Sequence, residues 1–220
     1  MKVLLSWSSG KDSAYALHAL RRDGCNVAGL LTTVNEAAGR VAIHGVRREL
    51  LEMQAAAAAT PLWTVPLPYP CSNEIYESRM AAALARAAEQ GFSHVAFGDL
   101  FLQDVRQYRE EQLGGTGLVP LFPLWNRPTA ALAREMLGAG VRAKLSCIDP
   151  RVLDRSFAGR EFDDALLDAL PPAVDPCAER GEFHTFAYDG PMFAQPIVLG
   201  TGIVVERDGF VFADLVPIVT

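Results

Sequence analysis

The sequence predicts an α/β fold in which a Rossmann-like parallel sheet is followed by a smaller α+β C-terminal domain. Short apolar runs alternate with amphipathic helical segments as far as Phe122, which is typical of a doubly wound sheet. The first apolar run ends in a serine and glycine turn that leads into a helix. Around Trp125–Pro128 the pattern changes to loop-rich sequence that ends in a hairpin. We therefore expect one domain over residues 1–127 and a second over residues 128–220.

Five apolar runs have the length of buried parallel strands and are too short to form helices. Pro66 and Pro68 place the end of the third run at an edge or outside the sheet, since proline has no N–H for the ladder. A brief additional strand is expected near Val41–Ile43. The five runs are residues 3–5, 26–34, 62–67, 95–97 and 118–122.

The segments between these runs have the periodicity of amphipathic helices. The first helix starts at Asp12 and has Arg21 and Arg22 in its last turn, where cations interact favourably with the helix dipole. The third has Ser72 as its N-cap and Gly91 as its stop. The four expected helices follow residue 12, lie between residues 46 and 59 and between residues 72 and 91, and run near residues 104–113.

The C-terminal part combines helices with an antiparallel pattern. Residues 129–137 and 163–170 have helical periodicity. Residues 141–148 alternate as a strand, and the turn Asp208–Gly209 joins the two strands of a hairpin over residues 202–215. We expect this domain to pack over the mouth of the parallel sheet, where its strands end.

The composition narrows the class of protein. Half of the 220 residues are hydrophobic and 21% are charged, which is ordinary for a globular protein. No apolar run approaches the ~18 residues of a membrane span, so we expect a cytoplasmic protein without membrane contact. The net charge of −6 argues against bulk nucleic-acid binding. The four cysteines include no C-x-x-C pair, so reduced thiols are expected and a zinc site is not. A homo-oligomer is compatible with all of these features.

The stretch V-L-L-S-W-S-S-G-K-D-S, from Val3 to Ser13, has the character of an anion-binding loop. A strand, a Ser/Gly turn and a helix start bring backbone N–H groups and the positive end of the helix dipole to one point. It is not a P-loop, because Leu5 stands where the first glycine is needed and Asp12 follows Lys11. The alternative is an ordinary strand-to-helix turn with a Ser/Gly cap.

The loop S-S-G-K-D-S at residues 8–13 resembles the pyrophosphate loop S-G-G-x-D-S of the N-type ATP pyrophosphatases. Ser9 replaces the first glycine, which suits a serine only if its φ is negative. Three further segments follow in the order of a known family: I-H-G-V-R at 43–47, G-D-L-F-L-Q-D-V-R-Q-Y-R-E-E at 98–111 and D-P-C-A-E-R-G-E-F-H-T at 175–185. Together with the loop they make the chain similar to the diphthine–ammonia ligase family over nearly its whole length.

This resemblance implies an adenine nucleotide α-hydrolase-like sheet and an ATP-dependent amide ligase, with ATP and Mg²⁺ as cofactors. A substrate carboxylate would attack the α-phosphorus of ATP, pyrophosphate would leave, and ammonia would displace AMP from the acyl-adenylate. The carboxylate acceptor, a protein side chain or a small molecule, is not named by the sequence. The chain departs from the family at Ala178 and Arg180, where glycine and asparagine are usual, so the sequence leaves open whether the acceptor pocket keeps the family's shape.

The resemblance also assigns roles to residues. Asp12 is expected to hold Mg²⁺, because a carboxylate beside phosphates needs a bridging cation, or else to be a helix N-cap. The expected nucleotide-binding residues are Ser8, Ser9, Gly10, Lys11, Asp12, Ser13, Thr32, Thr33, His44 and Asp99. Substrate-binding roles are expected for Asp104 and Thr185, and catalytic roles for Arg106, Arg109, Glu182 and His184.

The catalytic candidates each have a structural alternative. Arg106 and Arg109 are suited to phosphate or carboxylate because arginine binds both bidentately, but they also fit a solvated helix face with an Arg106–Glu110 pair. Alternation along a strand would place Glu182 and His184 on one face, where they would bind ammonium and accept its proton. The alternative for this second pair is a loop–strand junction held by polar caps.

Two other functions remain open from the sequence. One is a tRNA-modifying pyrophosphate-loop enzyme, for which the chain lacks paired cysteines and a basic face. The other is a module that senses ATP or AMP without catalysis, which would not require polar side chains at Glu182 and His184. Cys177 is expected to be a structural thiol, since no histidine stands beside it in the sequence.

Overall fold

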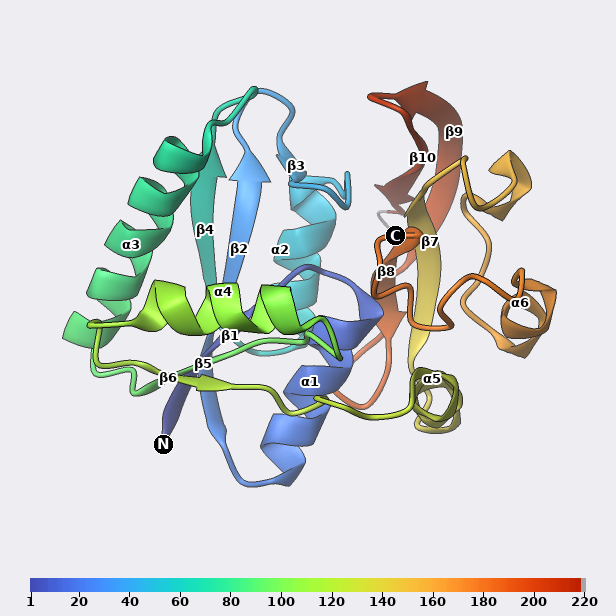
Figure 1. The fold of residues 1–220 in the computed structure, drawn as a ribbon. Coiled ribbons are helices and arrows are strands. Elements are labelled where there is room, and N and C mark those ends of the chain that lie inside the picture. The colour runs from blue at the N-terminus through green and yellow to red at the C-terminus, as the bar shows by residue number, and fades with distance from the viewer. Residues whose placement is uncertain (219–220) are drawn as a thin grey trace.

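Two sheets organise the protein, of which the computed structural model describes residues 1–218 (Figure 1). The first is a six-stranded, mostly parallel sheet, and the second is a four-stranded antiparallel sheet formed by the C-terminal part. They lie side by side with helix α1, Lys11–Arg22, between them (Figure 1). The α/β class expected from the alternation of apolar runs and helices is therefore confirmed.

The first sheet has its parallel strands in the order β4–β2–β1–β5–β6, and β3 pairs antiparallel with the end of β2. The strand order reverses between β1 and β5, which is the position where open α/β sheets bind ligands. The strands are β1 Lys2–Ser6, β2 Asn26–Asn35, β3 Arg40–Val41, β4 Leu62–Leu67, β5 His94–Ala96 and β6 Val119–Leu121.

Proline explains the position of β4. Within the described chain β4 pairs with β2 alone, so Pro66 lies on an edge strand as its missing N–H requires. The additional strand predicted near Val41–Ile43 is β3, which ends at Val41. It ends there because Ile43 has φ 65° and turns the chain away from the sheet.

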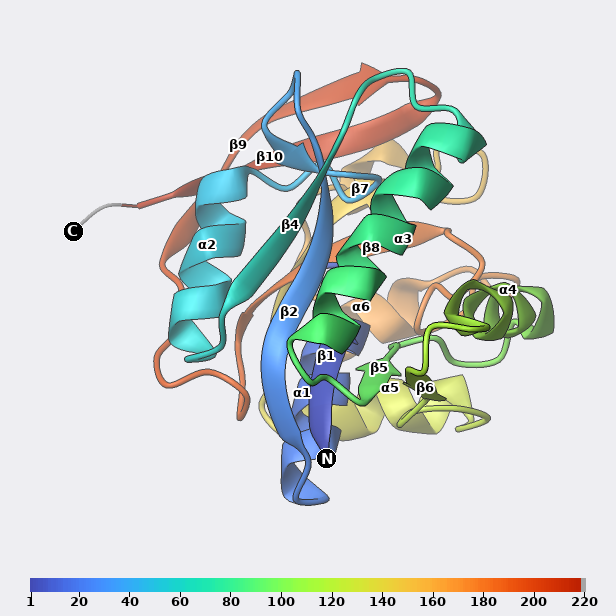
Figure 2. The same cartoon turned by 90° about the vertical axis from the view of Figure 1, so that its left-hand side faces the viewer.

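Helices cover both faces of the parallel sheet. Val3 and Leu5 of β1 pack with α1 and with α2, Arg48–Ala57, whereas Leu4 points to the other face and packs with α3, Asn73–Glu89. Figure 2 shows α2 and α3 on opposite sides of β2 and β4. Ser72 caps α3 as predicted, since its side chain accepts a hydrogen bond from the Ile75 N–H at 3.3 Å. Helix α4, Gln103–Leu113, follows β5.

The second sheet has the strand order β8–β7–β10–β9, and all its pairs are antiparallel. The predicted hairpin is present: Asp208 and Gly209 have φ values of 53° and 80° and join β9 to β10. The elements of this part are α5 Thr129–Gly138, β7 Arg142–Ile148, the short 3-10 helix η1 Arg155–Phe157, α6 Asp164–Ala169, β8 Phe183–Asp189, β9 Leu199–Arg207 and β10 Phe210–Pro217.

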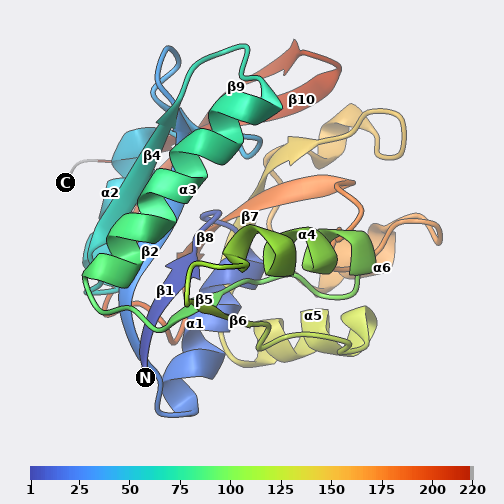
Figure 3. The ribbon, with the colours of Figure 1, turned by 60° about the vertical axis from the view of Figure 1, so that its left-hand side comes forward.

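One apolar core joins the two parts. Leu17 of α1, Met136 of α5 and Phe186 of β8 belong to the same buried cluster. Figure 3 shows α5 beside α1, and the Tyr15 hydroxyl of α1 lies 2.5 Å from Glu135 of α5. The C-terminal part thus lies beside the parallel sheet. Within residues 1–218, no helix has both the length and the apolar character needed to cross a lipid bilayer.

Candidate active site

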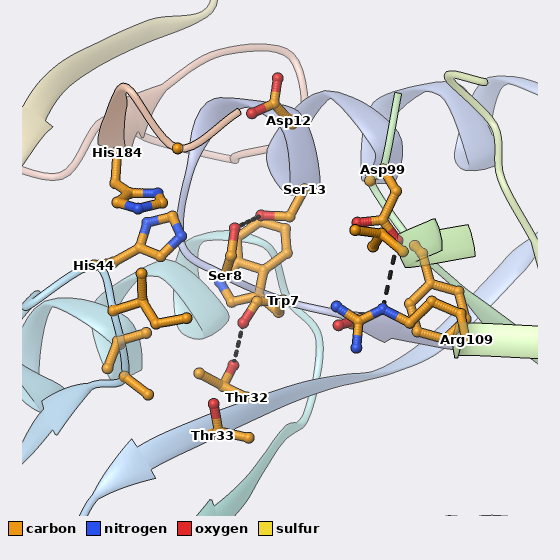
Figure 4. Close-up of a pocket in the computed structure, with 18 of the residues that line it drawn as sticks. Trp7, Ser8, Asp12, Ser13, Thr32, Thr33, His44, Asp99, Arg109 and His184 are labelled. Atoms are coloured by element: carbon orange, nitrogen blue, oxygen red, sulfur yellow. Dashed lines mark hydrogen bonds and ion pairs between the residues drawn. The ribbon is translucent and has the colours of Figure 1, made fainter. Parts of the chain in front are cut away.

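A cavity of about 910 Å³ opens where β1, β2 and β5 end, and side chains from both parts of the chain form its walls (Figure 4). This volume is within the range of ~300–1,000 Å³ that is usual for small-ligand sites. Most of the predicted site residues line it, namely Ser8, Lys11, Asp12, Ser13, Thr32, Thr33, His44, Asp99, Asp104, Arg109, His184 and Thr185. Four do not contribute to its lining: Ser9, Gly10, Arg106 and Glu182.

The turn between β1 and α1 forms one wall of the cavity. The hydroxyl oxygens of Ser8 and Ser13 lie 3.1 Å apart, and Ser13 Oγ donates to the Gly10 carbonyl at 3.0 Å (Figure 4). Helix α1 starts at Lys11, so its first N–H groups and the positive end of its dipole lie beside these hydroxyls. An anion placed here would meet hydroxyl donors and a helix N-terminus together.

Gly10 permits close approach to this turn. A Cβ on residue 10 would lie 3.1 Å from Cε1 of His44 and 3.3 Å from both Ser8 Oγ and the Thr185 carbonyl. Side-chain carbons in proteins are rarely this close to other heavy atoms, so any larger residue would displace these neighbours. The absence of a side chain at residue 10 is what lets the His44 ring pack onto the loop.

Strand β8 holds the same turn from the other side. The Lys11 N–H donates to Thr185 Oγ1 at 3.0 Å, and the Ala187 N–H donates to the Ser9 carbonyl at 3.0 Å. The buried side chain of Gln54 links the two segments, since its Nε2 donates to the carbonyls of Ser9 at 2.9 Å and of Ala187 at 2.6 Å. The loop therefore owes its shape to a C-terminal strand as well as to β1.

Two residues that replace family glycines have left-handed backbones. Ser9 has φ 70° and Ala178 has φ 60°, so the condition that a serine at this position should have negative φ is not met. Ser9 is fully buried, and its hydroxyl has no hydrogen-bond partner in the part of the chain that the structure describes. The Ser9 side chain therefore does not face the cavity, contrary to the expected contact with the nucleotide.

Lys11 and Asp12 form a close ion pair. Lys11 Nζ lies 3.1 and 2.9 Å from the two oxygens of Asp12 and donates to the Cys177 carbonyl at 2.6 Å. Burial opposes the charge on Lys11, but the charge and hydrogen bond of Asp12 together with the charges of Cys177 and Asp175 outweigh it, so the pKa of this lysine is raised. The Lys11 ammonium therefore binds two groups of the protein itself, the Asp12 carboxylate of α1 and the Cys177 carbonyl in the loop before β8.

The opposite wall of the cavity has an arginine with unused donors. Arg109 Nε lies 3.5 Å from Asp99 Oδ2, and neither atom has a hydrogen bond within residues 1–218. Figure 4 shows the guanidinium pointing across the cavity toward Trp7 and Thr32. Burial raises the pKa of Asp99, although the nearby Arg109 opposes the shift. Arg109 therefore has N–H groups that can bind an anion in the cavity.

Arg106 lies outside the cavity, although it is on the same helix as Arg109. Its Nε donates to Glu110 at 2.8 Å, and its guanidinium lies over the rings of Phe122 and Trp125 at 4.7 and 4.8 Å. This is the helix-face alternative, in which Arg106 pairs with Glu110 one turn further along α4. The structure therefore does not bring Arg106 to the cavity lining, and its catalytic role stays an expectation.

Two histidines from distant segments meet on a third wall. The ring centroids of His44 and His184 are 4.6 Å apart, and His44 Nδ1 lies 3.2 Å from the Thr185 carbonyl (Figure 4). Burial lowers the pKa of His44 to about 4, and burial with the neighbouring His44 lowers the pKa of His184 well below its usual value. Both rings are therefore neutral near pH 7. With Nδ1–H donated to Thr185, Nε2 of His44 is left as an acceptor.

Glu182 does not accompany His184 into the cavity. Strand β8 begins at Phe183, so the expected alternation does not extend to residue 182. The Glu182 carboxylate is buried, and it accepts the N–H groups of Asp175 and Arg180, both at 3.0 Å. Glu182 thus stabilises the loop before β8, as expected if polar caps hold the junction between this loop and the strand.

The glutamate that lines the cavity is Glu179, which the sequence did not single out. Glu179 Oε1 accepts the N–H groups of Leu100 at 2.7 Å and Phe101 at 3.3 Å. Burial raises the pKa of Glu179 to about 7; these two N–H groups oppose the shift, and the charges of Asp12 and Asp99 add to it. Its position depends on the path of a loop whose backbone cannot be derived from residue types.

The described residues offer little to a metal ion in the absence of a nucleotide. Residues 1–218 contain no group of three or more His, Cys, Asp or Glu side chains arranged to hold one. Asp12 supplies a single carboxylate, which is paired with Lys11. Thr32 and Thr33, near the end of β2, line the cavity, and Thr32 Oγ1 donates a hydrogen bond to the Trp7 carbonyl at 2.8 Å.

Comparison with known proteins places this site in a family context. The family model described as the diphthamide synthase N-terminal domain matches residues 1–114, and that of the diphthamide synthase C-terminal domain matches residues 128–206. The chain is 25% identical to a diphthine–ammonia ligase of Bos taurus and 24% identical to that of Homo sapiens. Each alignment covers 97% of this chain and 88% of the relative.

One solved structure has a weaker similarity. It is described as a predicted subunit of a tRNA methyltransferase from Methanocaldococcus jannaschii, and it aligns with a TM-score of 0.46 and 16% sequence identity. The alignment covers 87% of this chain and 98% of that one.

Proposed function

We propose, on the premise that this chain belongs to the diphthamide synthase family, that it is an ATP-dependent ligase that joins ammonia to a carboxylate and releases AMP and pyrophosphate. One observation carries the proposal: a loop of hydroxyls at a helix N-terminus faces an arginine across a single cavity. Such a loop stabilises negative charge on a leaving pyrophosphate, and an arginine opposite it stabilises charge at the α-phosphate.

In this mechanism the first step is adenylation. Ser8, Ser13 and the first turn of α1 bind the β- and γ-phosphates, and Thr32 and Thr33 at the end of β2 lie where we place the adenosine. A carboxylate oxygen of the acceptor forms a bond to the α-phosphorus, and the bond to the β-phosphate oxygen breaks. Arg109, whose N–H groups face the cavity, binds the α-phosphate oxygens as charge develops on them.

The second step is amidation. Ammonia attacks the carbonyl carbon of the acyl-adenylate, and AMP leaves with the electron pair of the C–O bond. His184 and His44 line the cavity beside the turn at residues 8–13. Both rings are neutral because their pKa values are lowered, so they add no positive charge to the site of this step. Asp104 and Thr185 also line the cavity, and we propose that Asp104 contacts the acceptor. Thr185 instead serves the loop through its bond with Lys11.

Mg²⁺ would enter with ATP. Magnesium in nucleotide enzymes is commonly held by one or two carboxylates together with substrate phosphates and water. Asp12 fits this requirement as a single, partly exposed carboxylate on the cavity wall, and it would exchange contact with Lys11 for contact with the ion. The chemistry supplied by the ion is neutralisation of phosphate charge, which lowers the barrier to pyrophosphate release.

The acceptor is a carboxylate whose identity we leave to experiment. The relatives are diphthine–ammonia ligases by name, so diphthine is the first carboxylate to test. The test incubates the protein with α-labelled ATP, Mg²⁺, ammonium and a panel of carboxylates that includes diphthine-bearing protein, and separates the products by chromatography. Carboxylate-dependent AMP, pyrophosphate and amide support the proposal. Carboxylate-dependent ADP and phosphate contradict it, and tight ATP binding without any turnover would favour the nucleotide-sensing alternative.

A further inference from the structure

Glu179 lines the cavity as a carboxylate whose position is fixed by backbone N–H groups and which no described cation pairs with. It lies on the loop that joins α6 to β8, and Oε1 is fixed by the N–H groups of Leu100 and Phe101. No hydrogen bond from residues 1–218 engages Oε2. The two N–H groups hold Oε1 in place, so the other oxygen, Oε2, is left to accept from a ligand.

Within residues 1–218, no lysine or arginine forms a salt bridge with Glu179. Lys11 of α1 is paired with Asp12, and Arg109 of α4 has Asp99 as its neighbouring carboxylate. Arg180, the next residue in the loop, has its guanidinium over the Phe101 ring at 5.6 Å. Glu179 is therefore available to a cationic ligand.

The other charges that act on Glu179 are negative. Asp12 from α1 and Asp99 from the segment after β5 both raise the pKa of Glu179, after the larger effect of burial. All three carboxylates line the cavity. These carboxylates lie among the groups suited to phosphate, since Asp12 precedes Ser13 in α1 and Asp99 is 3.5 Å from Arg109. A small cation bound by Glu179 would therefore lie close to the nucleotide, in the same cavity.

We propose that Glu179 binds ammonium and removes its proton, and that it thereby supplies the ammonia of the reaction. The inference rests on the proposed ligase function and names the residue that activates the nucleophile. One N–H bond of ammonium breaks, and its proton passes to the Glu179 carboxylate. The nitrogen lone pair then forms the bond to the carbonyl carbon of the acyl-adenylate. The adduct loses a second proton to water in the cavity as AMP departs.

Both the geometry and the proton affinity of Glu179 suit this role. Ammonium has a pKa of about 9, so a base must take its proton near neutral pH, and a base with a pKa near the working pH is the most effective. The pKa of Glu179, raised to about 7 chiefly by burial, meets that condition. Glu182, which the sequence suggested for this task, is enclosed by the Asp175 and Arg180 N–H groups instead.

The competing explanation is that Glu179 only clamps residues 100 and 101. The variant Glu179→Gln separates the two, because an amide oxygen still accepts both N–H groups but the side chain no longer takes a proton. Glu111→Gln is the matched control, since Glu111 is an exposed α4 carboxylate that bonds only to Gln107 in the described chain. Glu179→Asp keeps the acid on a shorter side chain and serves as the second variant.

Three rates are measured for each variant, with the carboxylate that supports AMP release in the product assay. Pyrophosphate exchange into ATP without ammonium reports adenylation alone. Ammonium-dependent amide formation reports the full reaction. Hydroxamate formation from hydroxylamine reports attack by a nucleophile that is mostly neutral near pH 7, so it needs no base to activate it.

For Glu179→Gln we expect amide formation to fall by about 100-fold, while exchange and hydroxamate formation stay within about threefold of the unaltered protein. Raising the pH toward about 9 should restore much of the amide rate, since free ammonia then becomes abundant. Glu179→Asp should lose less than Glu179→Gln, and Glu111→Gln should lose nothing.

Two results overturn the assignment. Either amide and hydroxamate formation fall equally in Glu179→Gln, which is the result of a structural clamp, or amide formation is unchanged. Failure of the proposed function gives a different result, because the unaltered protein itself then shows no pyrophosphate exchange with any carboxylate.

Discussion

His44 and His184 face each other with ring centroids 4.6 Å apart, although one follows β3 of the first sheet and the other lies on β8 of the second. Both rings are uncharged in the folded protein because burial lowers their pKa values. In the unfolded chain a histidine ionises near its ordinary pKa of about 6.5. This difference makes the free energy of unfolding depend on pH.

The first prediction follows from that difference. As the pH falls below about 6.5, the unfolded chain binds protons that folded His44 does not bind until about pH 4, so stability is lost across this window. We expect a loss of roughly 1–2 kcal/mol from the pair, after allowance for the partial exposure of the rings. Thermal unfolding at several pH values measures it. The dependence should be shallower in His44→Gln; an equal slope in His44→Gln would contradict the prediction.

Glu179 should act in the opposite direction. Its pKa is raised from 4.5 to about 7 by burial first, so the unfolded chain releases a proton that the folded protein keeps. Stability from this group is therefore present at low pH and lost as the pH rises from about 4.5 through 7. Glu179→Gln should be more stable than the unaltered protein above about pH 8, by roughly 1 kcal/mol after discounting for solvent screening. Equal stability of the two proteins at high pH would refute this.

Gly10→Ala should damage nucleotide binding. The added Cβ would lie 3.1 Å from Cε1 of His44 and 3.3 Å from a backbone oxygen, so the ring or the loop must shift. We expect ATP affinity to fall by about tenfold and stability by about 1–3 kcal/mol. Calorimetric titration and thermal unfolding measure these effects. Gly138→Ala in α5, where a Cβ meets no atom within 4 Å, is the control and should cost nothing.

Ser9→Gly should stabilise the protein. The change relieves a left-handed backbone and removes a buried hydroxyl without a described partner, which together outweigh the added freedom of the unfolded chain. We expect a gain on the order of 1 kcal/mol with ATP binding retained. Ala178→Gly relieves the same kind of backbone without involving a hydroxyl, so it should gain less. A less stable Ser9→Gly protein would show that the hydroxyl has a partner in solution.

Arg109 and Arg106 on α4 offer a paired test of the role proposed for Arg109 at the α-phosphate. Arg109→Ala should lower turnover by on the order of 100-fold, the usual effect of removing one transition-state donor. Arg106→Ala should stay within about threefold, because this side chain contacts Glu110 and two aromatic rings outside the cavity. The production of AMP under saturating ATP gives both rates. Equal losses in the two variants would mean that α4 matters through its packing alone.

Local signals predict the strands, the Ser72 cap and the turn between β1 and α1 that the structure has. Apolar runs, Ser72 and the Asp208–Gly209 turn each act over a few neighbouring residues, so they can be read along the chain. The distinction between Arg106 and Arg109 needs the helix to be packed, since both fit one amphipathic pattern. That Glu179 rather than Glu182 lines the cavity depends on a loop with left-handed residues at Ala178 and Gly181.

The hydrogen bonds between β8 and the turn at residues 8–13 affect how segments of this protein can be exchanged with those of its relatives. Lys11 is held by Thr185, and Ser9 is held by Ala187, so two short segments from opposite ends of the chain form one structural unit. A chimaera with its crossover anywhere between them would join a loop from one parent to a strand adapted to another. We expect substitutions in residues 9–11 and 185–187 to be inherited together, so that the unit of exchange is a contact surface and not a contiguous domain.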